Sequence, residues 1–183
     1  MAQVTVVYHS GYGHTQRVAE AVAEGAGAKL IAISAEGELS DSDWQTLDDS
    51  DAIIFGTPTY MGGPSWQFKK FADATSKAWM KQSWKDKIFG GFTNSASLNG
   101  DKQSTLNYLQ VLASQHGGIW VSLGLLPANT QASTREDINN LGGSVGVLVQ
   151  SPADAGAEVI PSGDIKTASQ YGKRVADITA KFA

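Results

Sequence analysis

VTVVYHSGYGHTQRVAEAVAEGA, residues Val4 to Ala26, is the stretch that decides the fold of this chain. It opens with an uncharged run of β-branched and aromatic residues from Val4 to Tyr8, which is typical of a strand buried on both faces. After the short segment Ser10 to Thr15, apolar residues recur at the spacing of one helix face. The stretch therefore predicts a strand, a tight loop and a helix, in that order.

The loop between this strand and helix has the composition of a phosphate site. The first turn of a helix leaves backbone N–H groups without partners, and the helix dipole adds partial positive charge there. Ser10 and Thr15 add hydroxyl donors, and the glycines allow the backbone to approach a ligand closely. The alternative is a plain strand-to-helix turn capped by a hydroxyl, and this loop alone does not decide between the two.

Two better-known nucleotide loops are excluded. The chain contains no Gly-x-x-x-x-Gly-Lys-Ser/Thr segment and therefore no Walker A lysine. Gln16 stands where the dinucleotide fingerprint requires a glycine, and the second predicted strand ends without an acid for a ribose hydroxyl. A monophosphate therefore fits the loop better than a pyrophosphate.

Length and composition describe one globular domain that spans residues 1–183. Hydrophobic residues make up 42% and charged residues 17% of the chain, which is enough apolar sequence for a substantial core. The net charge of −4 argues against a generic nucleic-acid-binding protein, which should be basic. Cysteine is absent, and no apolar run is long enough to span a bilayer. We therefore expect a cytoplasmic protein with no nucleic-acid or membrane partner.

Strand and helix patterns alternate along the rest of the chain. Further strands are predicted at Lys29–Ile33, Ala52–Phe55, Lys87–Thr93 and Ile119–Leu123, and helices within Glu36–Asp51, at Ser65–Lys77, at Thr105–Gln115 and after a capping Ser162. No regular element is expected in Thr57–Pro64 or in Leu125–Pro161. The alternation predicts an α/β fold, a doubly wound five-stranded parallel sheet of order 2-1-3-4-5 with helices on both faces.

Ligands of such a sheet bind beyond the carboxyl ends of the strands, where three predicted loops meet. These loops are rich in Gly, Ser, Thr and Asn and contain no acid: Ser10–Thr15, Pro58–Gly63 and Thr93–Gly100. The second loop supplies Pro58, Thr59, Tyr60 and Met61, and the third supplies Thr93, Asn94 and Ser95. Aromatic and thioether groups beside backbone donors suit a flat heterocycle, which with a monophosphate indicates FMN. The alternative is that Tyr60 and Met61 only cover the edge of the sheet.

Other chemistries have little support in the sequence. His9, His14 and His116 lack metal-ligand spacing, and there is no Gly-x-Ser-x-Gly nucleophile elbow. His116 ends the fourth predicted helix, which runs from the ligand edge back to the opposite edge of the sheet. A role for His116 at a flavin therefore needs a neighbouring subunit or an unusual connection.

Nearly the whole chain resembles the flavodoxin-like WrbA family, which comprises tetrameric FMN-dependent NAD(P)H:quinone oxidoreductases. The matching stretches are Tyr8–His14 (YHSGYGH), Gly56–Thr59 (GTPT), Gln67–Trp79 (QFKKFADATSKAW), His116–Gly118, Gly142–Gly143 and Pro161–Phe182. The chain departs from the family at Tyr60 and Met61, where arginine and phenylalanine are usual, and at Ser97–Asp101, where a Gly-Gly-Gln-Glu loop is usual. These departures bear on nicotinamide and quinone preference more than on FMN binding, which rests on backbone donors.

The resemblance implies roles for particular residues. The phosphate and ribityl end of FMN would be held by Ser10, Tyr12, Gly13, His14 and Thr15, the isoalloxazine by Pro58, Thr59, Tyr60 and Met61, and its other edge by Thr93, Asn94 and Ser95. The resemblance also implies that Trp79 reaches the flavin site of an adjacent subunit and that His116 is a catalytic residue near the flavin.

We therefore expect an FMN-dependent NAD(P)H:quinone oxidoreductase, which transfers hydride from NAD(P)H through the flavin to a quinone-type acceptor. A flavodoxin-type one-electron carrier is the alternative, and a non-catalytic flavin-binding module is a third possibility. Trp79 and Trp84 lie outside the obvious helix stripe, which favours an aromatic surface between subunits over a cap on the domain's own core. With the resemblance, they favour a homo-oligomer, either a dimer or a tetramer.

Overall fold

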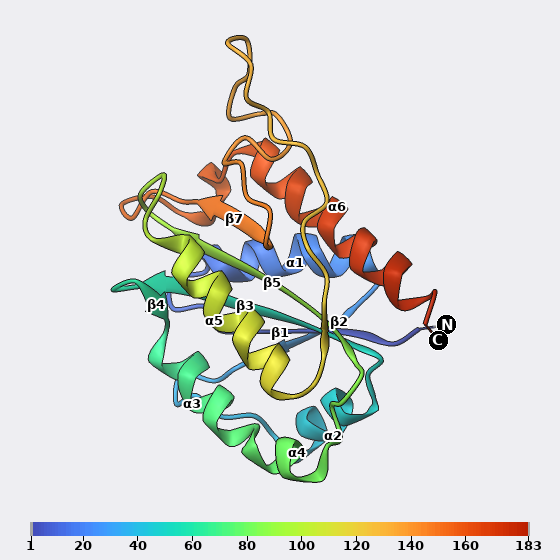
Figure 1. Ribbon diagram of the computed structural model, residues 1–183. Coiled ribbons are helices and arrows are strands. Elements are labelled where there is room, and N and C mark those ends of the chain that lie inside the picture. The colour runs from blue at the N-terminus through green and yellow to red at the C-terminus, as the bar shows by residue number, and fades with distance from the viewer. Residues whose placement is uncertain (1, 183) are drawn as a thin grey trace.

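The computed structural model describes residues 2–182 and has three layers, with a central sheet between two sets of helices (Figure 1). The strands are β1 (Val4–Tyr8), β2 (Lys29–Ala32), β3 (Ala52–Tyr60), β4 (Gly63–Pro64), β5 (Ile88–Ser95), β6 (Ile119–Trp120) and β7 (Val147–Gln150). The helices are α1 (His14–Ala26), α2 (Asp41–Asp49), α3 (Trp66–Ala74), α4 (Ser76–Lys81), α5 (Lys102–Gln115), α6 (Ser162–Thr179) and the short 3₁₀ helix η1 (Ala157–Val159). Helices α1 and α6 cover one face of the sheet, and α2 to α5 cover the other.

The parallel strands follow the order β2-β1-β3-β5-β6, which confirms the predicted doubly wound arrangement. Two strands share the fifth position, because β6 pairs with the beginning of β5 and β7 pairs with its end. Residues 121–146 leave the sheet between them and include the gold loop that projects at the top of Figure 1. The fifth strand is therefore interrupted by an insertion.

This insertion corrects two predictions. The strand expected at Ile119–Leu123 stays in the sheet only to Trp120, and Leu125–Pro161 contains both β7 and η1. Val147 and Val149 are fully buried on the sheet. An uncharged, valine-rich run of this kind is a strand signal, which the glycine-rich composition around it concealed.

The third strand runs to Tyr60 rather than ending at Phe55. Of its additional residues, 56–58 pair with β5, and Thr59 and Tyr60 pair with β4. A turn with two successive positive φ angles, 49° at Met61 and 79° at Gly62, connects β3 to β4. The expectation that Thr57–Pro64 contains no regular element is therefore wrong, because pairing with β5 and this turn hold the segment in strands.

Two helices also differ from the prediction. The helix expected at Ser65–Lys77 is divided at Thr75 into α3 and α4. Ser162 does not cap α6, because Pro161 occupies the cap position and Ser162 is the first helical residue. The hydroxyl of Ser162 instead donates to the carboxylate of Glu136, in the insertion.

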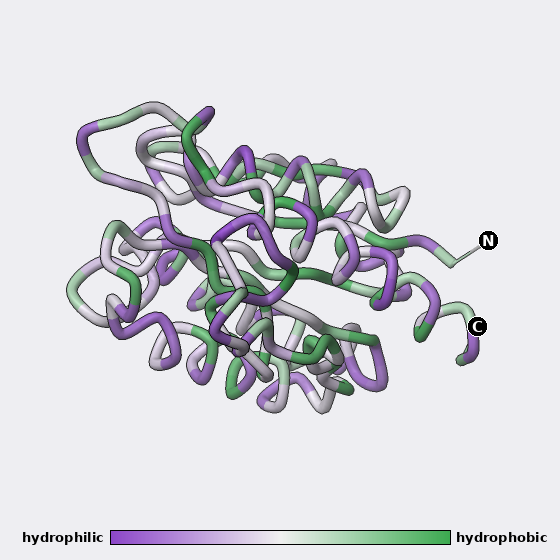
Figure 2. The backbone as a smooth tube through the Cα atoms, turned by 90° about the horizontal axis from the view of Figure 1, so that it is seen from above, coloured by the Kyte–Doolittle hydropathy of each residue, from purple (hydrophilic) through white to green (hydrophobic). Residues whose placement is uncertain are grey.

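Hydrophobic residues gather on the strands at the centre of the molecule, and hydrophilic residues lie mainly on the outer turns (Figure 2). Strands β1, β3 and β5 are buried along almost their whole length, as expected for parallel strands covered on both faces. Among the described helices, none combines the length and the apolar character that are needed to cross a membrane.

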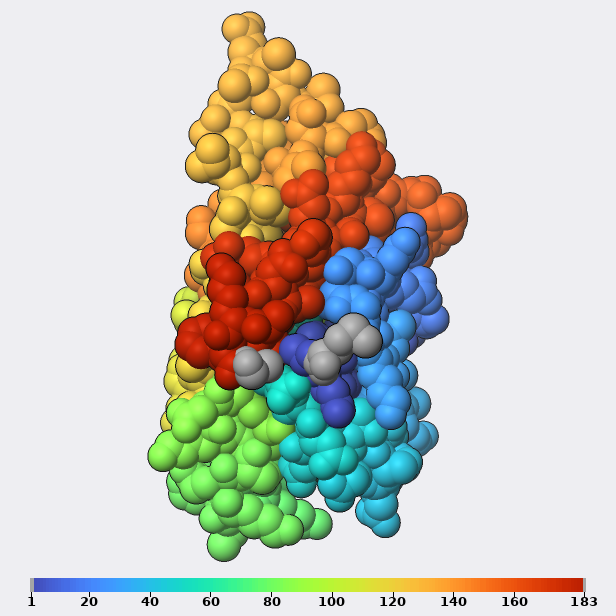
Figure 3. Space-filling model, turned by 90° about the vertical axis from the view of Figure 1, so that its right-hand side faces the viewer, coloured from blue at the N-terminus to red at the C-terminus, as the bar shows by residue number. Residues whose placement is uncertain are grey.

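Helices α1 and α6 lie directly against each other, blue against red in Figure 3. A Cβ atom at Gly25 would overlap the backbone of Ser169, and one at Gly172 would overlap the backbone of Val22. Glycine at these two positions therefore permits the close approach of the helices. This contact fixes the position of α1, and the first turn of α1 lies at the carboxyl end of β1.

We predict that Gly172→Ala lowers the free energy of unfolding by about 2 kcal/mol, because the new methyl group overlaps the Val22 carbonyl. Without such an overlap, replacing glycine by alanine inside a helix stabilises it by up to about 1 kcal/mol. Urea denaturation followed by circular dichroism measures the change. An unchanged or increased stability would contradict the close packing of the two helices.

Candidate functional site

A pocket of about 450 Å³ lies beyond the carboxyl ends of β1, β3 and β5. It is lined by Ser10, Tyr12, His14, Thr15, Pro58, Thr59, Tyr60, Asn94, Ser95, Ala96, Ser151 and Ala153. None of these residues is acidic, and most of their polar groups are hydroxyls and amides. The pocket volume lies within the range of small-molecule and cofactor sites, roughly 300–1,000 Å³.

The first wall of the pocket is the turn from β1 into α1. Gly13 has a φ of 88°, which favours glycine, and its N–H donates to Ser10 Oγ over 3.1 Å. The first turn of α1 contains no acidic residue that would oppose the partial positive charge of the helix N-terminus. The turn therefore presents backbone and hydroxyl donors in the arrangement that suits a phosphate group.

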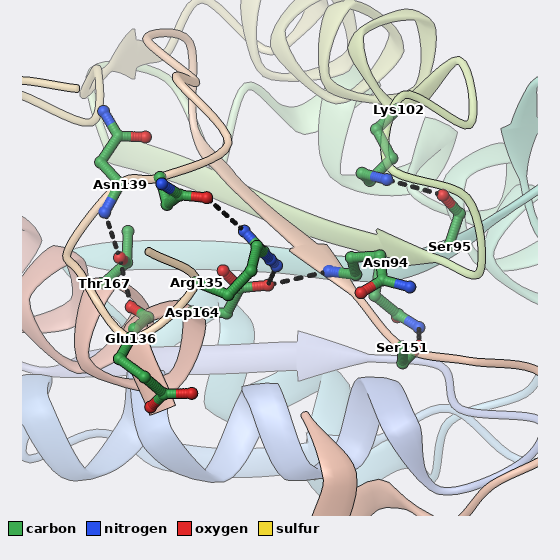
Figure 4. A network of polar contacts seen from close by, with 12 residues as sticks. Asn94, Ser95, Lys102, Arg135, Glu136, Asn139, Ser151, Asp164 and Thr167 are labelled. Atoms are coloured by element: carbon green, nitrogen blue, oxygen red, sulfur yellow. Dashed lines mark hydrogen bonds and ion pairs between the residues drawn. The ribbon is translucent and has the colours of Figure 1, made fainter. Parts of the chain in front are cut away.

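Asn94 joins three walls of the pocket through its side-chain amide. Thr15 Oγ1, on α1, donates to Asn94 Oδ1 over 2.5 Å. Asn94 Nδ2 donates to Ser151 Oγ, in the segment after β7, over 3.0 Å (Figure 4). All three side chains are buried, so the relative position of these walls depends on this one amide.

Strand β3 contributes Thr59, whose hydroxyl belongs to a row of three threonines. Thr59 Oγ1 lies 2.8 Å from Thr93 Oγ1 and donates to Thr105 Oγ1 over 2.8 Å. Thr93 and Thr105 are fully buried behind the wall. Thr59 therefore faces the pocket, while the other two threonines fix the orientation of its hydroxyl.

Two tyrosines form the open rim of the pocket, with Tyr12 82% exposed and Tyr60 41% exposed. Burial raises the pKa of the Tyr60 phenol, with a smaller contribution from Tyr12, so the phenol keeps its proton at neutral pH. A Cβ atom at Gly11 would lie 3.0 Å from Tyr60 Oη, so glycine leaves room for this ring over the turn. Aromatic faces beside polar donors suit a flat ring system.

Most of the residues predicted to bind FMN meet in this pocket. Those that line it are Ser10, Tyr12, His14, Thr15, Pro58, Thr59, Tyr60, Asn94 and Ser95. Gly13 and Thr93 are not among the lining residues, and they shape the turn and orient Thr59 respectively. Met61 is fully exposed at the turn between β3 and β4, and it does not line the pocket either.

His116 and Trp79 lie apart from the pocket. His116 is buried at the end of α5, where its Nε2 lies 2.9 Å from Thr75 Oγ1 and its ring packs on Trp84. This is the position that the topology predicts for the end of a helix that returns from the ligand edge. Trp79 is 47% exposed on α4, whereas Trp84 is fully buried, so the expectation that Trp84 forms a surface between subunits is wrong.

Three residues that line the pocket are not among those predicted from the sequence: Ala96, Ser151 and Ala153. Ser151 and Ala153 follow β7, which was not recognised as a strand. A strand paired in parallel with β5 ends at the same edge of the sheet, so the residues after it must reach the pocket. The valine-rich run of β7 is the signal that could have found them.

A partly buried ion pair holds the end of β7 in place. Arg135 Nη2, in the insertion, lies 2.6 Å from Asp164 Oδ2 in the first turn of α6 (Figure 4). The same oxygen accepts the N–H of Gln150 over 2.9 Å. Burial raises the pKa of Asp164, and the Gln150 N–H and the Arg135 guanidinium oppose that rise. The insertion, α6 and the end of β7 are therefore joined beside the pocket.

A sequence model of the NADPH-dependent FMN reductase family matches residues 8–132. The chain belongs to this family. A protein from Pseudomonas aeruginosa called flavodoxin FldP is 64% identical over 178 residues, which cover 97% of each protein. An NAD(P)H dehydrogenase (quinone) from Geotalea uraniireducens is 33% identical over 205 aligned residues, which cover 99% of each protein.

A solved structure extends the comparison to the fold. The crystal structure of a flavodoxin, WrbA-like protein from Agrobacterium tumefaciens superimposes with a TM-score of 0.84 at 55% identity, with full coverage of both chains. Together with the family match, this similarity confirms the flavodoxin-like fold and the resemblance to the WrbA family.

The cofactor that the family and these relatives imply is FMN, and the pocket residues fit it. The turn into α1 offers donors without an acid, which suits a phosphate, and the tyrosines offer flat faces, which suit an isoalloxazine. Between residues 2 and 182, no group of three or more His, Cys, Asp or Glu side chains could hold a metal ion.

We predict that Asn94→Ala weakens FMN binding by about tenfold, because Thr15 and Ser151 lose their buried partner. Quenching of flavin fluorescence measures the dissociation constant. Asn107→Ala, at an exposed position of α5, makes the same chemical change away from the pocket and should leave the affinity unchanged. Equal affinities of the two variants would contradict the role assigned to Asn94.

We predict that His116 makes the fold sensitive to acid. Burial lowers the pKa of His116, so below about pH 6.5 the unfolded chain binds a proton that the folded chain excludes, and the free energy of unfolding falls. Glutamine at this position cannot ionise. Between about pH 7.5 and pH 5.5, the free energy of unfolding, measured by urea denaturation, should therefore fall less in His116→Gln than in the unmodified protein. The control is His14→Gln, at a less buried position, and equal acid sensitivity of both variants would contradict this account.

Proposed function

We propose that the protein is an FMN-dependent oxidoreductase that transfers hydride from NAD(P)H through the flavin to a quinone-type acceptor. The observation that carries the proposal is a single pocket with neutral donors at the turn into α1 and exposed tyrosines at its mouth. The family match and the quinone dehydrogenase from Geotalea uraniireducens support the reaction.

The residues of this chain would bind and orient the cofactor. When bound, FMN supplies the chemistry of accepting hydride and returning two electrons to an acceptor. The turn from Ser10 to Thr15 would hold the phosphate through backbone N–H groups and the Ser10 hydroxyl, because the Thr15 hydroxyl already donates to Asn94. Asn94 and Ser95 would supply an amide and a hydroxyl to the polar edge of the ring system, and Thr59 would add a hydroxyl with a fixed orientation.

The mouth of the pocket would serve both substrates in turn. Tyr12 and Tyr60 leave the pocket open, and their aromatic faces suit a nicotinamide or a quinone ring. The protonated phenol of Tyr60 would donate a hydrogen bond to an oxygen of the acceptor. Because the two substrates share one opening, the oxidised nicotinamide must leave before the quinone binds, which gives ping-pong kinetics.

We further propose a homo-oligomer, dimer or tetramer, that is located in the cytoplasm, where NAD(P)H is supplied. Trp79 and Met80 are 47% and 78% exposed on α4, which is a surface of the kind that subunit interfaces cover. In such an assembly Trp79 would reach the flavin site of an adjacent subunit. A catalytic role for His116 depends on the same assembly, because His116 does not line the pocket of its own chain.

A one-electron carrier is the second candidate, because the Pseudomonas aeruginosa relative is called a flavodoxin. Such carriers dock their partners through an acidic rim around the flavin. The acidic cluster of this chain lies within residues 36–51, on α2 and beside it. Asp48 and Asp51 lie near Lys87, at the amino end of β5, and no acidic residue lines the pocket. This charge distribution favours the enzyme.

We predict that, without oxygen, the FMN-loaded protein oxidises one NAD(P)H per bound flavin on its own and turns over further NAD(P)H only when a simple quinone is present, at a rate well above that of free FMN. Parallel lines in double-reciprocal plots at several quinone concentrations would show the ping-pong order. Absorbance of NAD(P)H at fixed total FMN, with and without protein, measures the rate.

Two outcomes would contradict the proposed enzymatic activity. If FMN binds and no quinone is reduced, the chain is not a quinone oxidoreductase. If a reductive titration instead resolves two separate one-electron steps and NAD(P)H alone does not reduce the bound flavin, the carrier is the better description.

A further inference from the structure

Lys102, the first residue of α5, is buried behind the pocket although its side chain is basic. It is 1% exposed, and lysine is rarely buried to this degree unless it is paired with a carboxylate. The ion pairs among the described residues do not include it. Its Nζ donates to Ser95 Oγ over 2.8 Å, as Figure 4 shows, and to the Ser97 carbonyl over 2.6 Å. Both acceptors are neutral.

This ammonium lies immediately behind the wall that the third loop contributes. Ser95 lines the pocket, and Ser97 belongs to the loop that connects β5 to α5. The residues that line the pocket include no Asp, Glu, Lys or Arg. Lys102 therefore provides a positive charge close to a pocket whose own lining contains no Asp, Glu, Lys or Arg.

The charged groups that face Lys102 come from two other elements. Asp164, on α6, favours the protonated lysine, and Arg135, in the insertion, disfavours it. These two groups pair with each other at 2.6 Å, so their opposite electrostatic effects on Lys102 largely cancel. Burial lowers the pKa of Lys102 to about 8, so the ammonium stays mostly charged at neutral pH.

We propose that Lys102 is a positioning residue that raises the reduction potential of the bound flavin, because its buried charge acts on the ring through Ser95 and the following loop. This inference rests on the proposed function. Hydride transfer delivers two electrons and one proton to the ring and releases NAD(P)⁺, so the ring gains one negative charge unless another proton follows. A fixed positive charge in a poorly screened site favours that gain.

A purely structural role makes a different prediction. If Lys102 only ties Ser95 to Ser97, its replacement changes the affinity for oxidised and reduced FMN by the same factor and leaves the potential unchanged. If its charge acts on the ring, the affinity for the reduced form changes more. The reduction potential depends on the ratio of the dissociation constants for oxidised and reduced FMN. A shift in the potential therefore distinguishes an effect of the charge from a purely structural role.

The test compares three variants of the full chain loaded with FMN: Lys102→Gln, Lys102→Arg and Lys29→Gln. Lys29 is an exposed lysine at the amino end of β2, at the edge of the sheet away from the pocket. Lys102→Gln keeps a hydrogen-bond donor and removes the charge. We expect it to weaken binding of reduced relative to oxidised FMN about tenfold, which for two electrons lowers the potential by about 30 mV. Lys102→Arg and Lys29→Gln should change that ratio less than about twofold.

Spectroelectrochemical titration measures the potential, and fluorescence quenching measures the affinity for oxidised FMN. A shift in Lys102→Gln no larger than that in Lys29→Gln, with FMN still bound, would overturn the inference and leave the proposed function intact. Failure of the unmodified protein to bind FMN would overturn both.

If Lys102→Gln does not bind FMN, a second measurement tests whether the charge of Lys102 affects the potential. In the unmodified protein, reduction raises the affinity of Lys102 for its proton. The number of protons taken up per two electrons should therefore rise above one near pH 8. Lys102→Arg cannot lose its charge in this range and should show no such rise. Identical pH profiles of the potential in these two proteins would overturn the inference.

Discussion

Parallel pairing of β1, β3 and β5 is the constraint on which the candidate site depends. The register places Tyr8 beside Gly56 and Gly56 beside Phe92, so the three strands end at one edge of the sheet. Each connecting helix must then return to the opposite edge before the next strand begins. The connections that follow these strands therefore meet at the carboxyl edge, and the pocket forms between them. For the same reason His116, at the end of α5, lies at the edge of the sheet opposite the pocket.

Polar groups in and beside the pocket make its shape specific. Asn94 joins α1, β5 and the segment after β7, and the pair of Arg135 and Asp164 joins the insertion to α6. Buried polar groups cost stability unless each has a partner, so such groups tolerate few alternative arrangements. The close contact of α1 with α6 at Gly25 and Gly172 adds a steric constraint of the same kind. Together they hold the phosphate turn against the loops that face it.

The features that the sequence predicted are those that local composition determines. Uncharged runs such as Val4–Tyr8 are typical of strands covered on both faces, and their alternation with helices indicates the sheet order and the three loops. The second half of the fifth strand was missed, because the residues between β6 and β7 separate it from the part that was recognised. Ser151, which follows this strand, was therefore not predicted to line the pocket. The burial of Lys102 could not be predicted either, because a lysine at the start of a helix is normally solvated and only the tertiary fold covers it.

The central claim is that loops at the carboxyl edge of the sheet hold FMN through backbone N–H groups and hydroxyls. A crystal structure of the protein soaked with FMN tests it most directly. The account predicts the phosphate against the turn Ser10–Thr15 and the ring between Tyr60 and the loop that follows Ser95. Flavin density at any other surface, or a phosphate bound away from the first turn of α1, would contradict it.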